Sequence, residues 1–137
     1  MADNEKMFQV KIITPDRIFY TGEAEMIEFT TSSGQIGVYK KHIPLTTVLA
    51  PGAVIIHEAE GEKVAAVHAG FAEVLPERVT LLAEIAEWAE EIDLSRAEAA
   101  KARAEERLQA KAADLDLARA EFALRKALTR IGVKDMK

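Results

Sequence analysis

The sequence predicts an antiparallel β-sandwich followed by an antiparallel hairpin of two helices. All 4 prolines and 6 of the 7 glycines lie at or before Pro76. Valine and isoleucine together number 17 in residues 1–86 and only 3 in residues 87–137. β-branched residues favour strands, glycine and proline mark turns, and the alanine, leucine and charged residues of the second part favour helices. We therefore expect a β-sandwich domain over residues 1–86 and an α-helical domain over residues 87–137.

Segments of strand length alternate with turn signals along the first domain, a spacing typical of a sandwich or barrel. The Pro51-Gly52 pair suits a type II turn, and Gly61 lies at the expected tip of a hairpin. The expected strands are Phe8–Ile13, Arg17–Tyr20, Glu23–Thr30, Gln35–Val38, Leu45–Leu49, Ala53–Glu58, Lys63–Ala69, Phe71–Leu75 and Arg78–Ala83.

An acidic segment from Glu84 to Asp93 joins the two domains and carries five carboxylates without a basic residue. Carboxylates are favourable before and within the first turn of a helix, where the helix dipole is positive. The first helix is expected to begin at Leu94 or Arg96, with either Ser95 or Asp93 as its cap, and to end at residue 110 or 111.

The second helix is expected to begin after the break at residues 114–116, to run to about Arg130 and to stop at Gly132. Apolar residues recur along it at helical spacing, whereas the first helix presents mostly alanine. An alanine-rich seam buries little apolar area, so the hairpin needs the sandwich, a ligand or another protein to hold its position. The expected seam residues are Ala97, Ala100, Ala104, Leu108, Leu117, Phe122, Leu124, Leu128 and Ile131.

Composition excludes several classes of function. The formal net charge is −5 and there is no long basic run, which argues against nucleic-acid binding. There is no cysteine, no secretory signal and no apolar stretch long enough to span a membrane, so we expect a soluble cytoplasmic protein that meets a membrane only through a partner. The three histidines, His42, His57 and His68, lack the spacing of a metal or catalytic site, and no phosphate-binding loop is present.

The C-terminal segment is basic, since residues 119–137 carry a net charge of +4. One interpretation is a set of solvated helix faces whose ion pairs contribute a few tenths of a kcal/mol each. The other is that Arg96, Lys126 and Arg130 converge on an anion, or that the basic segment docks on an acidic partner. The residue pattern leaves both open.

Three stretches in the observed order resemble the epsilon subunit of the bacterial F-type ATP synthase. The first runs from Gly34 to Tyr39 and continues into residues 42–45, and the second runs from Gly70 to Val74 and continues into residues 79–83. The third is Ile92-Asp93 to Arg96-Ala97, continuing through residues 103–108. The resemblance covers nearly the whole chain.

The resemblance implies a non-catalytic subunit of the central stalk, which couples rotation of the c-subunit ring to the catalytic head. The sandwich would bind the gamma subunit and rest on the c-ring, with Gln35 and His42 facing the ring. The helical hairpin would inhibit ATP hydrolysis when it extends into the catalytic head, which is formed by the alpha and beta subunits. In that state Arg125, Lys126 and Arg130 would meet acidic segments of the beta subunits. The expected location is the cytoplasmic side of the bacterial cell membrane, at its periphery.

Some bacterial relatives bind ATP in the folded hairpin, and the resemblance implies ATP as a regulatory ligand here, with no cofactor required. Carboxylates can accept hydrogen bonds from the adenine amino group, and guanidinium groups suit phosphate oxygens. Lys126 replaces an arginine of those relatives, which keeps the charge and loses the bidentate geometry. The implied residues are Glu87, Ile92, Asp93, Arg96, Ala97, Arg103, Lys126 and Arg130. The alternatives are a stand-alone ATP-sensing module and a small enzyme that uses its histidines.

Overall fold

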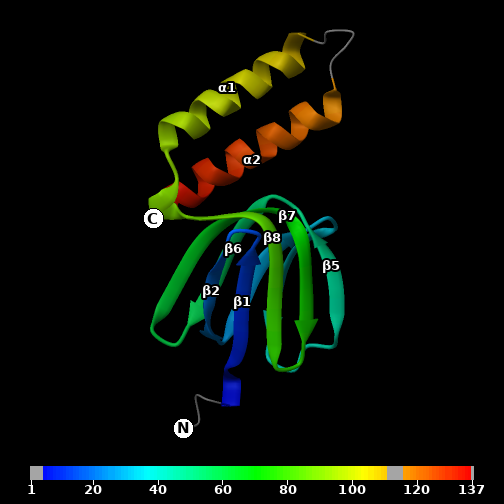
Figure 1. The fold of residues 1–137 in the computed structure, drawn as a ribbon, viewed down its shortest axis with the longest axis vertical. Helices are drawn as coiled ribbons and strands as arrows, with labels where there is room; N and C mark the ends of the chain where they lie inside the picture. The colour runs from blue at the N-terminus through cyan, green and yellow to red at the C-terminus, as the bar shows by residue number, and fades with distance from the viewer. Residues whose placement is uncertain (1–4, 111–115, 137) are drawn as a thin grey trace.

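The computed structural model describes residues 5–110 and 116–136, which form a β-sandwich with two helices at one end (Figure 1). This confirms the fold class that the sequence predicts. The strands are β1 (Phe8–Thr14), β2 (Arg17–Ala24), β3 (Met26–Thr31), β4 (Gly34–Tyr39), β5 (Leu45–Leu49), β6 (Gly52–Glu58), β7 (Gly61–Leu75) and β8 (Arg78–Trp88). A short 3₁₀ turn, η2 (Ala89–Glu91), leads to the helices α1 (Leu94–Ala110) and α2 (Leu117–Asp135).

The strands are joined in the order β2-β1-β8-β7-β5-β3-β4, and β6 pairs with both β3 and β7. The pairs are antiparallel except β1 and β8, which run parallel. The first part of β7 pairs with β6 and its last part pairs with β5, so this strand takes part in both layers. The core between the layers is aliphatic and aromatic, with Phe29, Ile12, Ile27 and Leu81 fully buried.

Strand β7 is continuous where the sequence predicts two strands. Ala69 has φ 62° and Gly70 has φ 121°, and the chain bends there while keeping its pairing with β8 on both sides. A Cβ atom at position 70 would overlap the carbonyl oxygen of Leu82, so only glycine allows the two strands to approach this closely. The turn signal at Gly70 therefore marks a bend within one strand.

Strand β8 is also longer than predicted, because it continues past Ala83 to Trp88. The first part of the acidic segment is thus strand, and the first turn of α1 contains no acidic residue. Asp93 caps α1, since its carboxylate accepts a 3.1 Å hydrogen bond from the backbone N–H of Arg96. Of the two possible caps, the structure selects Asp93 over Ser95.

Helix α2 begins as predicted, because Asp116 caps it by accepting a hydrogen bond from the backbone N–H of Arg119. The other residues of the predicted break, 114 and 115, and the alternative end of α1 at residue 111 lie outside the described residues. The predicted stop at Gly132 is wrong, since α2 continues to Asp135. Gly132 lacks the left-handed conformation of a helix-ending glycine, and Val133 behind it is fully buried and holds the last turn in place.

The seam of the hairpin is narrower than the periodicity predicts. Alanines at positions 97, 104, 120 and 127 are buried, whereas Leu117, Phe122 and Leu128 are exposed. Alanine lets two helices approach closely, so the larger side chains remain outside the seam. Neither α1 nor α2, the two α-helices of the described residues, has the length and hydrophobicity that a membrane-spanning helix needs.

Candidate functional site

The connection between the sandwich and the hairpin is fixed to strand β2. The Arg17 guanidinium donates to both carboxylate oxygens of Glu91, at 2.9 and 3.0 Å. The same carboxylate accepts a 2.9 Å hydrogen bond from the backbone N–H of Trp88, whose ring stacks on Phe19 with centroids 4.2 Å apart. The Arg17 guanidinium lowers the pKa of the Glu91 carboxyl below its ordinary value. The chain is therefore anchored to the sandwich as far as Glu91, and the hairpin begins just beyond this anchor.

A second set of contacts holds α2 against the sandwich. The Nε of Arg130 donates a 2.6 Å hydrogen bond to Oε1 of Glu87 at the end of β8. The Nζ of Lys134 donates a 2.9 Å hydrogen bond to the carbonyl oxygen of Ala89. A small apolar cluster, made of Val64, Ala66, Ala89, Ile92 and Val133, packs beneath these polar contacts.

A cavity of about 270 Å³ opens between the helices and the anchored connection. Its walls come from β8, η2, the residue before α1, and both helices. Charged side chains dominate the walls, three carboxylates and three guanidinium groups. The lining residues are Glu87, Glu91, Asp93, Arg96, Ala97, Ala100, Arg103 and Arg130.

The charges in this cavity are only partly paired. Arg130 pairs with Glu87, and Glu91 pairs with Arg17 outside the cavity. Arg96 and Arg103 have no ion pair with another described residue, and they lie two helical turns apart on one face of α1. Two unpaired guanidinium groups beside a third, Arg130, make a site suited to an anion with several oxygens.

The pKa of the Glu87 carboxyl is about 2, well below its usual value of 4.5. The neighbouring His68 lowers it most and Arg130 lowers it further, whereas partial burial acts in the opposite direction. Glu87 is thus charged at neutral pH. An ionised carboxylate can only accept hydrogen bonds, which suits an amino group of a ligand.

Six of the eight residues implied for ATP line this one cavity. The other two lie elsewhere. Ile92 is buried in the apolar cluster under α2, and Lys126 places its Nζ 5.2 Å from the centre of the Phe122 ring. Glu91 and Ala100 also line the cavity, although neither was predicted from the sequence. Ala100 follows Arg96 by one helical turn, so helical periodicity could have found it, whereas the place of Glu91 depends on Arg17, far away in the sequence.

The histidines differ from one another in their surroundings. His57 lies between two carboxylates, with Nε2 2.6 Å from Glu28 and Nδ1 3.0 Å from Glu62. His68 is only 1% exposed and lies in β7 beneath the hairpin. Among the described residues, no group of three His, Cys, Asp or Glu side chains is arranged to hold a metal ion.

The residues expected to meet partner subunits lie on three different elements. Gln35 is exposed near the start of β4, and His42 lies in the loop after that strand, with Nδ1 2.6 Å from the carbonyl oxygen of Ile43. Arg125 is exposed on α2, and Lys126 and Arg130 are partly buried on the same helix.

An apolar row crosses one outer face of the sandwich. Strand register places Val48 opposite Phe71 and Phe71 opposite Leu82, and Leu82 is in turn opposite Ile13 across the parallel pair. Ile18 on β2 extends the row past Ile13. Phe71 is 56% exposed and Ile18 is 63% exposed. Contiguous exposed apolar side chains are typical of surfaces that contact another protein.

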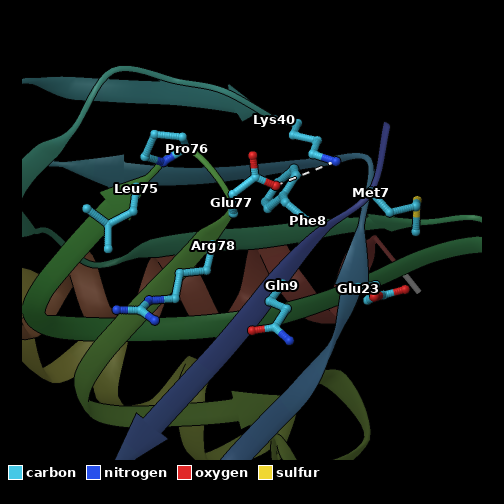
Figure 2. A pocket seen from close by; sticks show the side chains of 9 residues that line it. All are labelled: Met7, Phe8, Gln9, Glu23, Lys40, Leu75, Pro76, Glu77 and Arg78. Atoms are coloured by element: carbon cyan, nitrogen blue, oxygen red, sulfur yellow. Dashed lines mark ion pairs between the residues drawn. The ribbon is translucent and has the colours of Figure 1, made fainter. Parts of the chain in front are cut away.

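A hollow of about 640 Å³ lies where β1 and β8 begin and β7 ends (Figure 2), at the end of the sandwich opposite the helices (Figure 1). Lys40, in the loop that also carries His42, pairs with Glu77 at 3.6 Å, and both residues line the hollow. The backbone N–H of Lys41 donates a 2.7 Å hydrogen bond to the carbonyl oxygen of Pro76. The loop containing His42 is therefore tied to the β7–β8 turn at this end of the sandwich.

Comparison with known proteins assigns both parts of the chain. Residues 7–89 match the family model for the ATP synthase delta/epsilon chain β-sandwich domain, and residues 90–135 match the model for the long α-helix domain of the same chain. The chain belongs to the epsilon-chain family of F-type ATP synthases. The ATP synthase epsilon chain of Caldanaerobacter subterraneus subsp. tengcongensis is 45% identical over 130 residues, which cover 94% of each chain. The epsilon chain of Shouchella clausii is 48% identical and covers 94% of this chain and 96% of its own.

Solved structures share the fold of this epsilon-family chain. A chain in a mitochondrial ATP synthase structure from Euglena gracilis, comprising OSCP, F1 and the c-ring, superposes with a TM-score of 0.80 at 22% identity. The match covers 90% of this chain and 79% of the other. A chain of the central stalk and c-ring structure from Tetrahymena thermophila covers 94% of each chain with a TM-score of 0.54 at 16% identity.

Membership of the epsilon family gives the general role. The chain is a non-catalytic subunit of the central stalk of an F-type ATP synthase and assembles with other subunits of that complex. The recognition made from the three sequence stretches is therefore confirmed.

Proposed function

We propose that this subunit couples rotation of the c-ring to the catalytic head, and that its helical hairpin inhibits ATP hydrolysis in a way that ATP relieves. The observation that carries the proposal is the cavity between hairpin and sandwich. Arg96 and Arg103 from α1 and Arg130 from α2 converge there on space that a polyanion can occupy. A ligand held by both helices and by the end of β8 favours the folded hairpin over an extended one, by its difference in affinity for the two.

ATP fits the chemistry of this cavity in two respects. The guanidinium groups suit phosphate oxygens, and Glu87 and Asp93 offer acceptors for the adenine amino group. The volume of about 270 Å³ is small, so part of a nucleotide would remain in solvent. The cavity is not built for hydrolysis, since it combines arginines and carboxylates without a phosphate-binding loop.

Calorimetry on the full chain tests nucleotide binding. Arg103→Gln should weaken ATP binding by about tenfold or more, because it removes a charge-assisted contact to phosphate. Arg119→Gln is the matched control, since Arg119 is an exposed arginine near the start of α2 outside the cavity. Absence of heat at millimolar ATP would remove nucleotide control from the proposal.

We infer that the apolar row is the surface on which the gamma subunit docks. The row crosses five strands, so it is about 19 Å long at the usual strand spacing. Its residues are exposed in this chain, and a partner would remove them from water. The end of the sandwich that carries His42 and the hollow at Glu77 would then face the c-ring, and the subunit would lie at the membrane periphery on the cytoplasmic side.

Co-purification of the complex tests the docking surface. Phe71→Asp should greatly reduce recovery of the gamma subunit, because it places a charge in the middle of the row. Ala59→Asp, in the exposed β6–β7 turn, is the control and should leave recovery unchanged. Equal recovery with both variants would show that gamma binds elsewhere.

Inhibition is tested in the assembled complex by removing residues from Asp93 onward. The sandwich and its Arg17–Glu91 anchor remain, so assembly should persist while ATPase activity rises. Arg125 and Lys126, which we propose meet acidic segments of the beta subunits, give a finer test. Reversal of both charges should reduce inhibition, and unchanged activity in the truncated complex would exclude an inhibitory hairpin.

A further inference from the structure

His68 is a buried titratable residue to which the proposed nucleotide site assigns no role. Its side chain is 1% exposed, and neither ring nitrogen has a hydrogen-bond partner among the described residues. Its Nε2 lies 3.5 Å from Oε1 of Glu87, which is within ion-pair distance but longer than an ordinary N–H···O hydrogen bond. Buried polar groups in native proteins are usually paired, so this arrangement needs a reason.

Strand register explains why His68 faces the hairpin. Ala66 lies opposite Glu87 and His68 lies opposite Ile85, so His68 and Glu87 are diagonal neighbours on one face of the β7–β8 pair. Arg130 of α2 reaches the same Glu87 oxygen at 2.6 Å from the other side. One carboxylate oxygen is thus approached by a residue of the sandwich and by a residue of the hairpin.

The charged groups close enough to act electrostatically on His68 are Glu87 from β8 and Arg130 and Lys126 from α2. The cluster beside them, drawn from β6, β7, η2 and α2, is apolar. A neutral ring with its proton on Nε2 can point that proton at the Glu87 carboxylate. A protonated ring would add a third positive charge beside Arg130 and Lys126, in a place shielded from water.

We propose that His68 is a positioning residue of the cavity, which supports Glu87 and the docked hairpin while its ring is neutral and releases the hairpin when the ring is protonated. The inference rests on the proposed hairpin that can leave the sandwich, and it does not require that the cavity bind a nucleotide. Burial, and then the nearby Arg130 and Lys126, lower the pKa of His68 from its ordinary 6.5, against the opposing effect of Glu87. Release would return the ring to water and to its ordinary pKa.

The direction of the pH effect follows from linkage. The released form binds the proton more tightly than the docked form, so docking is undisturbed above about pH 6.5 and weakens as the pH falls below it. A single proton can change the ratio of docked to released hairpin by at most about tenfold per pH unit. The carboxyl of Glu87 does not contribute in this range, because its pKa is already about 2 when docked and ordinarily 4.5.

The test measures the position of the hairpin in the full chain as a function of pH, without nucleotide. The chain has no cysteine, so Ala59→Cys in the β6–β7 turn and Glu121→Cys on α2 allow a fluorescent distance pair. Between pH 7.5 and 5.5 the ratio of docked to released hairpin should fall by about three- to tenfold. His68→Gln should abolish this fall, and His42→Gln, in the loop after β4, should leave it as in the parent. The same fall in all three proteins would overturn the proposal.

An NMR titration of the imidazoles keeps the proposal testable if His68→Gln prevents docking altogether. In the unsubstituted chain, His68 should titrate below 6.5, and ATP should lower its midpoint further, because binding to the docked form and protonation oppose each other. A midpoint at or above 6.5 would overturn the proposal. If ATP has no effect while release by acid persists, the nucleotide site is rejected and the role of His68 stands.

Discussion

Arg130 and Glu87, 43 residues apart in the sequence, share a 2.6 Å hydrogen-bonded ion pair that joins α2 to the end of β8. Both side chains are about one quarter exposed. Both residues line the cavity and Glu87 also contacts His68, so the pair connects three features: the docked hairpin, the anion site and the buried histidine.

Glu87→Gln should weaken docking of the hairpin. Glutamine has nearly the same shape but carries no charge, and the Arg130 guanidinium would lose its ionic partner in a partly buried place, at a cost of about 1–3 kcal/mol. The fluorescent distance pair measures this as a shift toward released hairpin. Glu98→Gln, at an exposed position of α1, is the control and should cause little change. Equal shifts in the two variants would contradict a docking role for Glu87.

Acid should destabilise the chain through the same carboxylate, at lower pH than through His68. The pKa of Glu87 is about 2 in the folded chain against 4.5 ordinarily, so its contribution is complete above about pH 4.5 and is lost as the pH falls toward 2. With allowance for screening by solvent, we expect a loss of about 1–2 kcal/mol. Chemical unfolding at a series of pH values should show this loss in the parent and not in Glu87→Gln. Parallel curves would assign the acid sensitivity to other groups.

Arg17→Met should loosen the connection without much effect on global stability. The Arg17–Glu91 pair is about two-fifths exposed, and exposed pairs contribute at most about 1 kcal/mol. Glu91 would still accept from the backbone N–H of Trp88 but would no longer be held to β2. Hydrogen exchange should therefore accelerate at the amides of Trp88 and Ile92, while amides in the core of β1 stay protected. Unchanged exchange at Trp88 would show that aromatic stacking alone holds the connection.

Two glycine substitutions should have opposite effects. Gly70→Ala forces a Cβ into the backbone of β8 at a φ of 121°, and we expect a loss of about 2 kcal/mol or more in the free energy of unfolding. Gly132→Ala adds a methyl group in open space within α2 and should stabilise the helix by about 0.5–1 kcal/mol. Denaturant unfolding measures both. A tolerated Gly70→Ala would mean that β7 can straighten at the bend.

Much of the fold is readable from the sequence because it depends on local preferences. Alternation of apolar residues, turn residues and the cap at Asp116 located the strands of the sandwich and the start of α2. The errors came where a distant contact overrides a local signal. Local rules predict that Gly70 ends a strand and that Gly132 ends a helix. Strand β7 nevertheless continues through Gly70, because it stays paired with β8, and α2 continues past Gly132, because Val133 is buried.

Most residues of the candidate site could be predicted from the sequence, but the contacts between them and distant residues could not. Family resemblance supplied Glu87, Asp93, Arg96, Ala97, Arg103 and Arg130, which the structure brings around one cavity. It also supplied Ile92 and Lys126, which the structure places in the apolar cluster and beside Phe122. Nothing local to Glu91 indicates that Arg17 holds it, and nothing local to His68 indicates that α2 covers it.

The sequence by itself determined the division of this protein into a sandwich and a hairpin and its membership of the epsilon family, because composition, periodicity and motif order are properties of the chain alone. The tertiary structure decided where the hairpin rests, which arginines have no ion pair among the described residues and which histidine is buried. Those properties depend on side chains from β2, β7, β8 and both helices that meet only when the chain has folded. Their energies arise from burial and charge at the contacts between elements, which no single segment contains.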